Sequence, residues 1–185
     1  MNAVRKPASY EDVLNAPEHL VAEILAGGLY THPRPGPRHA RSAGRLLGHI
    51  DEPFDRGRGG PGGWIILIEP ELHLGQDVMV PDVAGWRRER LPALPDAAWF
   101  DLVPDWACEV LSPSTARIDR QIKMRLYAQH GLPYLWLVDP IAQTLEAYRR
   151  EGEYWLLLTT HGGDEKAAIE PFDAVPLELA ELWAD

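Results

Sequence analysis

The sequence has 185 residues, of which 45% are hydrophobic and 25% are charged, and its net charge at pH 7 is −10. A chain of this length and composition can bury a core of its own, which excludes an intrinsically disordered protein and predicts a single domain over residues 1–185. Cys108 is the only cysteine, so an internal disulfide and a cysteine-built zinc site are excluded as well.

The sequence also indicates where the protein works. No apolar run approaches the roughly 18 residues that a membrane-spanning helix needs. The amino terminus carries Glu11 and Asp12 where a signal peptide would have an apolar core. We therefore expect a cytoplasmic protein that does not enter a membrane.

The negative charge is unevenly distributed. Residues 161–185 contain seven acidic residues and one lysine, whereas residues 31–58 contain six arginines and three acidic residues. A second group of arginines lies at residues 87–90. These arginines are either candidate phosphate contacts or an ordinary solvated surface, and the overall acidity argues against a broad basic surface for nucleic acid.

The first part of the chain predicts helices around a hairpin. Residues 8–16 are typical of a short helix capped by Ser9, and residues 21–30 of two short strands joined by a tight turn at Gly27-Gly28. Residues 31–37 contain three prolines and predict an irregular segment. Residues 38–50 have apolar side chains at helical spacing and predict a second helix.

The remaining elements predict a mixed sheet. A glycine-rich loop is expected at residues 57–63, and a connection at residues 91–102. The expected strands are residues 64–74, 77–86, 106–111 and 134–138, with a hairpin of residues 144–148 and 154–160. Helices are expected at residues 115–130 and 176–183. The strand–helix–strand unit over residues 106–138 predicts two parallel strands, so the fold class is α/β (α+β), a mixed β-sheet flanked by helices.

Glu109 is the most informative polar residue, because it interrupts a strand that is otherwise apolar. A carboxylate buried there without a partner would cost several kcal/mol, so a cation must meet it. That cation is either a basic side chain or a metal ion. Asp82 follows Pro81 in a turn, where an acid can be structural, solvated or functional.

Lys123 is a candidate partner of Glu109. Position 111, which shares the face of Glu109 on the strand, holds a leucine, so a lysine must come from elsewhere. On the following helix Asp119, Lys123 and Tyr127 form one stripe at the boundary of the apolar face. The alternative is an exposed Asp119–Lys123 pair without a function.

These residues resemble a known family. The resemblance rests on residues 80–82, residues 109–115, Asp119, Lys123, Tyr127, Gly131 and residues 134–140, with Glu23, Gly27 or Gly28, and His39 before them. This ordered set covers nearly the whole chain and is similar to the Uma-type bacterial restriction endonuclease family of the PD-(D/E)XK nuclease superfamily. Leu135 and the position of Gly27-Gly28 depart from the family pattern.

The resemblance implies a restriction-endonuclease-like core and a set of roles. Asp82 and Glu109 would bind Mg²⁺ (or Mn²⁺) together with the Val110 carbonyl, and Lys123 would be a catalytic lysine that has moved from the strand to the helix. Glu23 would be an additional acid of the site. His39, Arg38 and Tyr127 are candidate substrate-binding residues, although His39 is equally well explained as a surface histidine and Tyr127 as a packing residue.

We therefore expect a metal-dependent DNA endonuclease that hydrolyses phosphodiester bonds and acts as a homodimer. The alternative is a catalytically inactive nuclease-fold protein that binds nucleic acid or a protein partner, which the net acidity favours. A weaker alternative takes Asp82 and Glu109 as an acid–base pair that acts on sugars.

Overall fold

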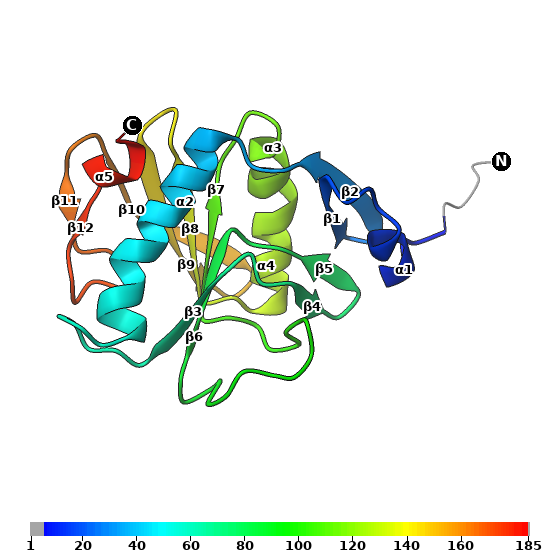
Figure 1. Cartoon of the computed structure of the whole chain (residues 1–185), viewed down its shortest axis with the longest axis horizontal. Coiled ribbons are helices and arrows are strands. Elements are labelled where there is room, and N and C mark those ends of the chain that lie inside the picture. Colours follow the sequence, from blue (N-terminus) through cyan, green and yellow to red (C-terminus); the bar gives the residue numbers. More distant parts are fainter. Residues whose placement is uncertain (1–5, 185) are drawn as a thin grey trace.

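The computed structural model of the protein describes residues 6–184. Its strands form a six-stranded sheet in the order β10-β9-β8-β7-β6-β3, a four-stranded sheet in the order β2-β1-β5-β4, and a two-stranded sheet of β11 and β12. Figure 1 shows α2 and α4 beside the large sheet, the four-stranded sheet at one end of the molecule, and β11, β12 and α5 at the other. The chain therefore has the mixed α and β architecture that the sequence predicts.

The large sheet has six strands. Its members are β3 (Trp64–Ile68), β6 (Val83–Arg87), β7 (Trp106–Val110), β8 (Tyr134–Asp139), β9 (Thr144–Glu151) and β10 (Tyr154–Gly162). The smaller sheets contain β1 (Leu20–Leu25), β2 (Gly28–Pro33), β4 (Leu72–Leu74), β5 (Asp77–Met79), β11 (Lys166–Ala167) and β12 (Leu177–Glu178). β7 and β8 pair in parallel, which confirms the crossover expected over residues 106–138.

Five α-helices and two π-helical turns accompany the sheets among the described residues. The α-helices are α1 (Tyr10–Leu14), α2 (Pro37–Ile50), α3 (Ala116–Ile118), α4 (Met124–His130) and α5 (Ala180–Trp183), and the π-helical turns are η1 (Asp51–Asp55) and η2 (Asp119–Lys123). α3, η2 and α4 follow one another and end at Gly131, whose φ of 89° only glycine adopts readily. The expected helix over residues 115–130 thus contains a π-helical turn, a feature that is frequent at functional sites.

The strand expected at residues 64–74 is divided into β3 and β4, and the strand expected at residues 77–86 into β5 and β6. In each case the two parts belong to different sheets. β3 pairs with β6 in the large sheet, and β4 pairs with β5 in the small one. Pro70 and Pro81 lie between these pairs, and a proline cannot donate a ladder hydrogen bond. The β-ribbon therefore bends between the two sheets, and the bend carries Val80 and Asp82.

Two other expected boundaries were wrong. β2 continues to Pro33, so residues 31–33 of the segment expected to be irregular are a strand that pairs with β1. The expected helix over residues 176–183 is the short strand β12 followed by α5. In both places pairing with a neighbouring strand, β1 or β11, outweighs the local preference that the sequence displays.

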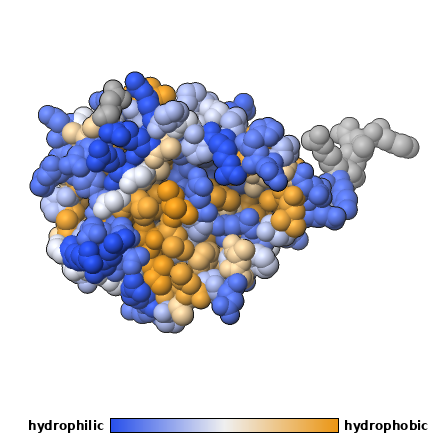
Figure 2. Space-filling model, viewed as in Figure 1, coloured by the Kyte–Doolittle hydropathy of each residue, from blue (hydrophilic) through white to orange (hydrophobic). Residues whose placement is uncertain are grey.

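The two faces of the large sheet pack against different elements. Trp106, Cys108 and Val110 of β7 belong to a cluster with α2 and the carboxy-terminal segment. Ala107 belongs to a second cluster with Leu126 and Tyr127 of α4. Because side chains alternate along a strand, Glu109 faces the side of α4. Figure 2 shows that one face of the molecule has a hydrophobic area beside α2 within a largely hydrophilic rim.

None of the helices in residues 6–184 combines the length and the apolar character needed to span a membrane.

Candidate active site

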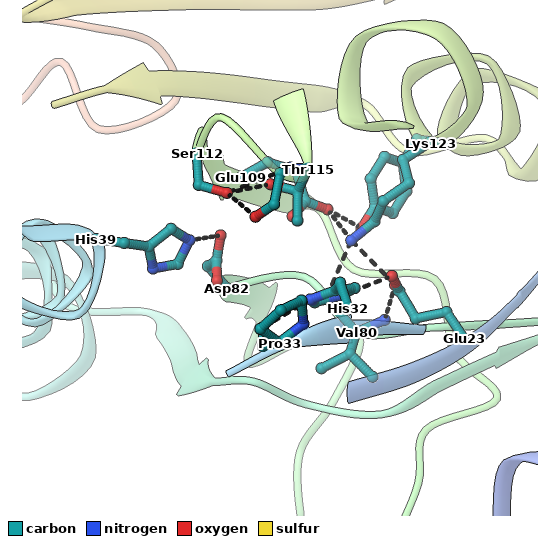
Figure 3. A network of polar contacts seen from close by, with 12 residues as sticks. Glu23, His32, Pro33, His39, Val80, Asp82, Glu109, Ser112, Thr115 and Lys123 are labelled. Carbon is teal, nitrogen blue, oxygen red and sulfur yellow. Dashed lines mark hydrogen bonds and ion pairs between the residues drawn. The ribbon is translucent and has the colours of Figure 1, made fainter. Parts of the chain in front are cut away.

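A cleft of about 240 Å³ opens where β1, the bend of the β-ribbon, the end of β7 and the helix after it meet. Its lining includes Asp82, Glu109, Asp119, Lys123 and His39. Figure 3 shows Asp82 and Glu109 in a polar network with Glu23 and Lys123 at one end and His39 at the other. Residues from three parts of the sequence are thus brought together by the fold.

Lys123 is the centre of this network. Its Nζ lies 2.8 Å from Glu109 Oε1 and 3.0 Å from Glu23 Oε1. It also donates a hydrogen bond of 3.1 Å to the carbonyl oxygen of Val80. An ammonium group has three N–H donors, so all three have a partner. Burial opposes the charge of Lys123, but Glu109 and Glu23 outweigh it and hold the pKa of the ammonium well above its ordinary value.

Glu109 is buried on β7 and is held from α4. The Tyr127 hydroxyl donates a 2.6 Å hydrogen bond to Glu109 Oε1, the same oxygen that Lys123 contacts. Burial raises the pKa of the Glu109 carboxyl well above its ordinary value although Lys123 opposes the shift, and the neighbouring acids Asp119, Asp82 and Glu23 raise it further. These contacts leave the second carboxylate oxygen for another ligand in the cleft.

Glu23 has the opposite electrostatic balance. Its Oε1 accepts a 2.8 Å hydrogen bond from the Val80 N–H, and its Oε2 lies 3.4 Å from His32 Nε2. Burial would raise the pKa of Glu23, but the charge of Lys123 and the hydrogen bond from His32 lower it. Glu23 is therefore an ionised carboxylate that fixes Lys123 from the side of the small sheet.

Asp82 and His39 form the other end of the network. Asp82 Oδ2 accepts a 2.7 Å hydrogen bond from the Val110 N–H and lies 3.2 Å from His39 Nε2. Burial would lower the pKa of His39, but Asp82 raises it through its hydrogen bond and charge. The other ring nitrogen, Nδ1, is buried and has no hydrogen-bond partner among residues 6–184.

Asp119 adds a further acid to the cleft. Its side chain lies in the π-helical turn and is only 4% exposed. Burial raises the pKa of Asp119 to about 6, although Lys123 and Thr115 oppose the shift. The cleft thus contains more carboxylates than cationic side chains.

The donor atoms of the cleft suit a hard divalent cation. Asp82 and Glu109 offer carboxylate oxygens, and Mg²⁺ and Mn²⁺ prefer oxygen ligands. Burial and, to a smaller extent, the neighbouring acids raise the pKa of Glu109, and a cation in the cleft would stabilise its ionised form. Within residues 6–184 no three histidine, cysteine or acidic side chains are gathered closely enough to hold a metal ion by themselves. A site made of two carboxylates and a backbone carbonyl is compatible with that finding.

Comparisons with known proteins identify the family of the chain and a structure of similar fold. Residues 7–180 match the family Uma2, described as "Putative restriction endonuclease". The chain belongs to the Uma2 family. The fold is similar to that of a crystal structure described as a putative nuclease belonging to DUF820, from Anabaena variabilis ATCC 29413. The TM-score is 0.74 at 23% sequence identity, over 96% of this chain and 98% of that one. No curated protein matches the chain.

Uma2 membership and the structural similarity confirm the restriction-endonuclease-like fold and a nuclease-type family. The structure brings Glu23, Asp82, Glu109, Lys123 and His39 into one network, in which the Val110 N–H links Asp82 to the end of β7. Arg38 does not line this cleft, but it lines a neighbouring pocket. The expected contact of Tyr127 with substrate was wrong, because Tyr127 is fully buried behind Glu109 and has no surface to offer.

Sequence reasoning missed part of the network of this Uma2 chain. His32 was missed because the prolines around it predict an irregular segment. A two-residue turn in the first hairpin would have indicated its position, because it pairs Tyr30 with Glu23 and places His32 on the same face as Tyr30. Val80 contributes only its backbone N–H and carbonyl oxygen, and a pattern of side chains cannot predict a contact made by the backbone. The burial of Asp119 was missed because its helical stripe lies at the edge of the apolar face.

Proposed function

We propose that the protein hydrolyses phosphodiester bonds in DNA with Mg²⁺ or Mn²⁺, as a PD-(D/E)XK-type endonuclease. The observation that carries the proposal is the buried contact of Lys123 with Glu109, beside Asp82, in a cleft open to a substrate. A helix-borne lysine in this position supports the interpretation that the catalytic lysine has moved away from the strand.

Asp82, Glu109 and the Val110 carbonyl would hold the metal ion. When bound, the ion supplies charge stabilisation to the phosphate and lowers the pKa of bound water. The hydrogen bond from the Val110 N–H to Asp82 fixes this aspartate against the end of β7. Tyr127 and Lys123 fix Glu109 through its Oε1, so the metal would take the remaining oxygen.

Lys123 would orient the attacking water and stabilise the charge that develops on the phosphate. Because its three donors are occupied, one of them must be exchanged for water or a phosphate oxygen. Glu23 is the positioning residue that keeps the ammonium at the cleft. His39 would contact the phosphate, since it lines the cleft and Asp82 raises the pKa of its imidazole, which favours the cationic form.

Supercoiled plasmid with Mn²⁺ tests the proposal. Wild-type protein should nick or linearise the plasmid, whereas Asp82→Ala and Lys123→Ala should lose the activity. Asp96→Ala, which changes an exposed acid outside the cleft, is the control and should cut like wild type. Cleavage that survives both substitutions in the cleft contradicts the proposal.

A second candidate function is a nuclease-fold protein that binds nucleic acid or a partner without cutting. The fully occupied donors of Lys123 favour it, because the lysine then acts as a structural ion-pair partner. Calorimetric titration with Mn²⁺ separates the two functions. A cutting enzyme should bind the ion with an affinity that Asp82→Ala abolishes, whereas a non-catalytic protein should bind none in the cleft.

We also propose that the protein forms a homodimer through β10. This strand is the outer strand of the large sheet, and its Tyr154, Leu156 and Leu157 are exposed. The other edge is covered, because Asp55 accepts a hydrogen bond from the Ile66 N–H of β3. An open apolar edge pairs readily with a second copy. Light scattering should give a dimer that Leu157→Lys dissociates and that Leu14→Lys, on α1, leaves intact; a wild-type monomer contradicts this.

A further inference from the structure

A second pocket of about 250 Å³ lies next to the proposed catalytic cleft. The two cavities share His39, Ser112 and Pro113 in their linings, so they are direct neighbours. In Figure 3, His39 and Ser112 lie at the end of the network that is remote from Glu23. A group bound in the second pocket would therefore extend from the His39 side of the cleft.

The chemistry of the second pocket differs from that of the cleft. Its walls are largely apolar and include Pro37, Pro113, Pro140 and Ile141. No carboxylate lines it, and its charged or titratable groups are Arg38 and His39. Proline rings and an isoleucine side chain offer flat hydrocarbon surfaces to a planar group. This lining suits the face of a nucleobase and does not suit a phosphate.

The turn that presents Ile141 is held in place. Asp139 Oδ1 accepts hydrogen bonds of 2.9 Å from the Ile141 N–H and 2.8 Å from the Ala142 N–H. Ile141 nevertheless remains 62% exposed, an unusual position for a large apolar side chain. An ordered turn that keeps an isoleucine at the rim of a pocket pre-forms a contact surface at little entropic cost.

A third, polar pocket follows on the far side of the second one. It shares Arg38, Pro140 and Ile141 with the second pocket and adds Arg41 and Gln143. Arg41 is oriented by a 2.7 Å hydrogen bond from its Nε to the carbonyl oxygen of Ala184. The surface thus passes from an acidic cleft that suits a metal ion and a phosphate, through an apolar pocket, to a pair of arginines.

We propose that the second pocket holds one unpaired nucleobase of a DNA strand whose neighbouring phosphate lies in the catalytic cleft. Arg38 and Arg41 bind the next phosphate along the strand. The inference rests on the proposed function and narrows its substrate to DNA with an unpaired nucleotide at the cleavage position. A base inside a duplex is stacked and paired, so it can enter the pocket only after it has left the stack.

Binding of short oligonucleotides tests the pocket without requiring cleavage. The probes are a fluorescein-labelled thymidine decamer and a decamer of the same length with abasic residues, titrated with the full chain in the presence of EDTA. Stacking of one base contributes about 1 kcal/mol or more to the binding free energy, so the thymidine probe should bind at least about fivefold more tightly than the abasic probe. Ile141→Ser should remove that preference and leave the affinity for the abasic probe unchanged.

Two further variants make the test specific. Leu94→Ser changes an apolar side chain that is similarly exposed, at 57%, but lies outside the three pockets, and it should retain the preference. Arg38→Gln should weaken both probes alike and reduce the salt dependence of binding, because it removes a phosphate contact. Thermal melting of each variant checks that it is folded.

The outcomes separate the pocket from the proposed function. Cleavage of plasmid that depends on Lys123, together with equal affinity of wild type for the two probes, overturns the base pocket and leaves the nuclease intact. The same holds if Ile141→Ser keeps the preference for thymidine. Failure of wild type to bind either probe overturns the base pocket, whereas the plasmid assay in Mn²⁺ decides the proposed function.

Discussion

The Lys123 ammonium lies 2.8 Å from Glu109 Oε1, and both side chains are at most 4% exposed. Such a pair is held together because each partner would be costly to bury alone. The lysine comes from the helix and the glutamate from the preceding strand, so their contact depends on how the helix packs on the sheet. Substitutions in this pair therefore test both the stability of the fold and the proposed catalysis.

The first prediction is that Lys123→Met destabilises the protein. It leaves Glu23 and Glu109 buried without their cation, and the loss of one partner of a buried ion pair costs on the order of 3 kcal/mol. Urea unfolding of wild type and variant measures the difference.

Lys166→Met is the matched control, because the Lys166–Glu178 pair has a similar contact distance of 2.7 Å but is exposed. It should leave the urea midpoint almost unchanged, since solvent screens exposed pairs. Equal effects of the two substitutions would show that burial does not govern the strength of the Lys123 pair.

The second prediction concerns Tyr127, which supports Glu109 without facing the cleft. Tyr127→Phe keeps the ring in the core and removes the 2.6 Å hydrogen bond to Glu109 Oε1. A group that orients a metal ligand typically contributes about 10-fold to 100-fold to affinity or activity. The variant should therefore bind Mn²⁺ about 10-fold more weakly and cut more slowly, while its near-UV circular dichroism shows intact packing.

Tyr134→Phe is the control for this substitution. The Tyr134 hydroxyl donates to Glu170, far from the cleft, over 3.2 Å. Its Mn²⁺ affinity should equal that of wild type. If Tyr127→Phe also binds Mn²⁺ like wild type, the hydrogen bond does not serve the metal site.

The parts of the site that could be predicted from the sequence are those with a local pattern. Strand alternation placed Glu109 on a covered face, and helical spacing placed Lys123 and Tyr127 on one stripe. The contacts of His32 and Val80 depend on the register of the β1–β2 hairpin and on the bend of the β-ribbon, which the side-chain pattern of a single segment does not fix. The division of the strands expected at residues 64–74 and 77–86 was missed for a similar reason. Pro70 and Pro81 predict a break in a strand, but they do not predict which sheet the chain enters after the break.

The third prediction is a pH-dependent gain of stability in Asp119→Asn. Burial raises the pKa of Asp119 from 3.8 to about 6 in the folded protein. The folded state thus binds the proton more tightly than the unfolded state, and stability falls as the pH rises between these values. At pH 8 the charged form costs the wild type on the order of 3 kcal/mol, which asparagine avoids.

Urea unfolding in EDTA from pH 4 to pH 8 measures this effect. Asp119→Asn should match wild type near pH 4 and exceed it increasingly up to about pH 7. Asp96→Asn, an exposed control, should follow wild type at every pH. A constant difference across the pH range would mean that Asp119 does not titrate as its burial requires.

The fourth prediction is that a divalent cation stabilises the folded protein. Asp82, Glu109 and Asp119 all line the cleft, and burial together with the charges of Asp119 and Asp82 raises the pKa of Glu109 well above its ordinary value. A cation that binds only the folded state adds about 2.7 kcal/mol at a concentration 100 times its dissociation constant. Thermal melting should therefore show a higher Tm in Mn²⁺ than in EDTA. Asp82→Asn should lose this increase, whereas Asp96→Asn should keep it. An increase of equal size in Asp82→Asn would place the stabilising ion elsewhere on this acidic protein.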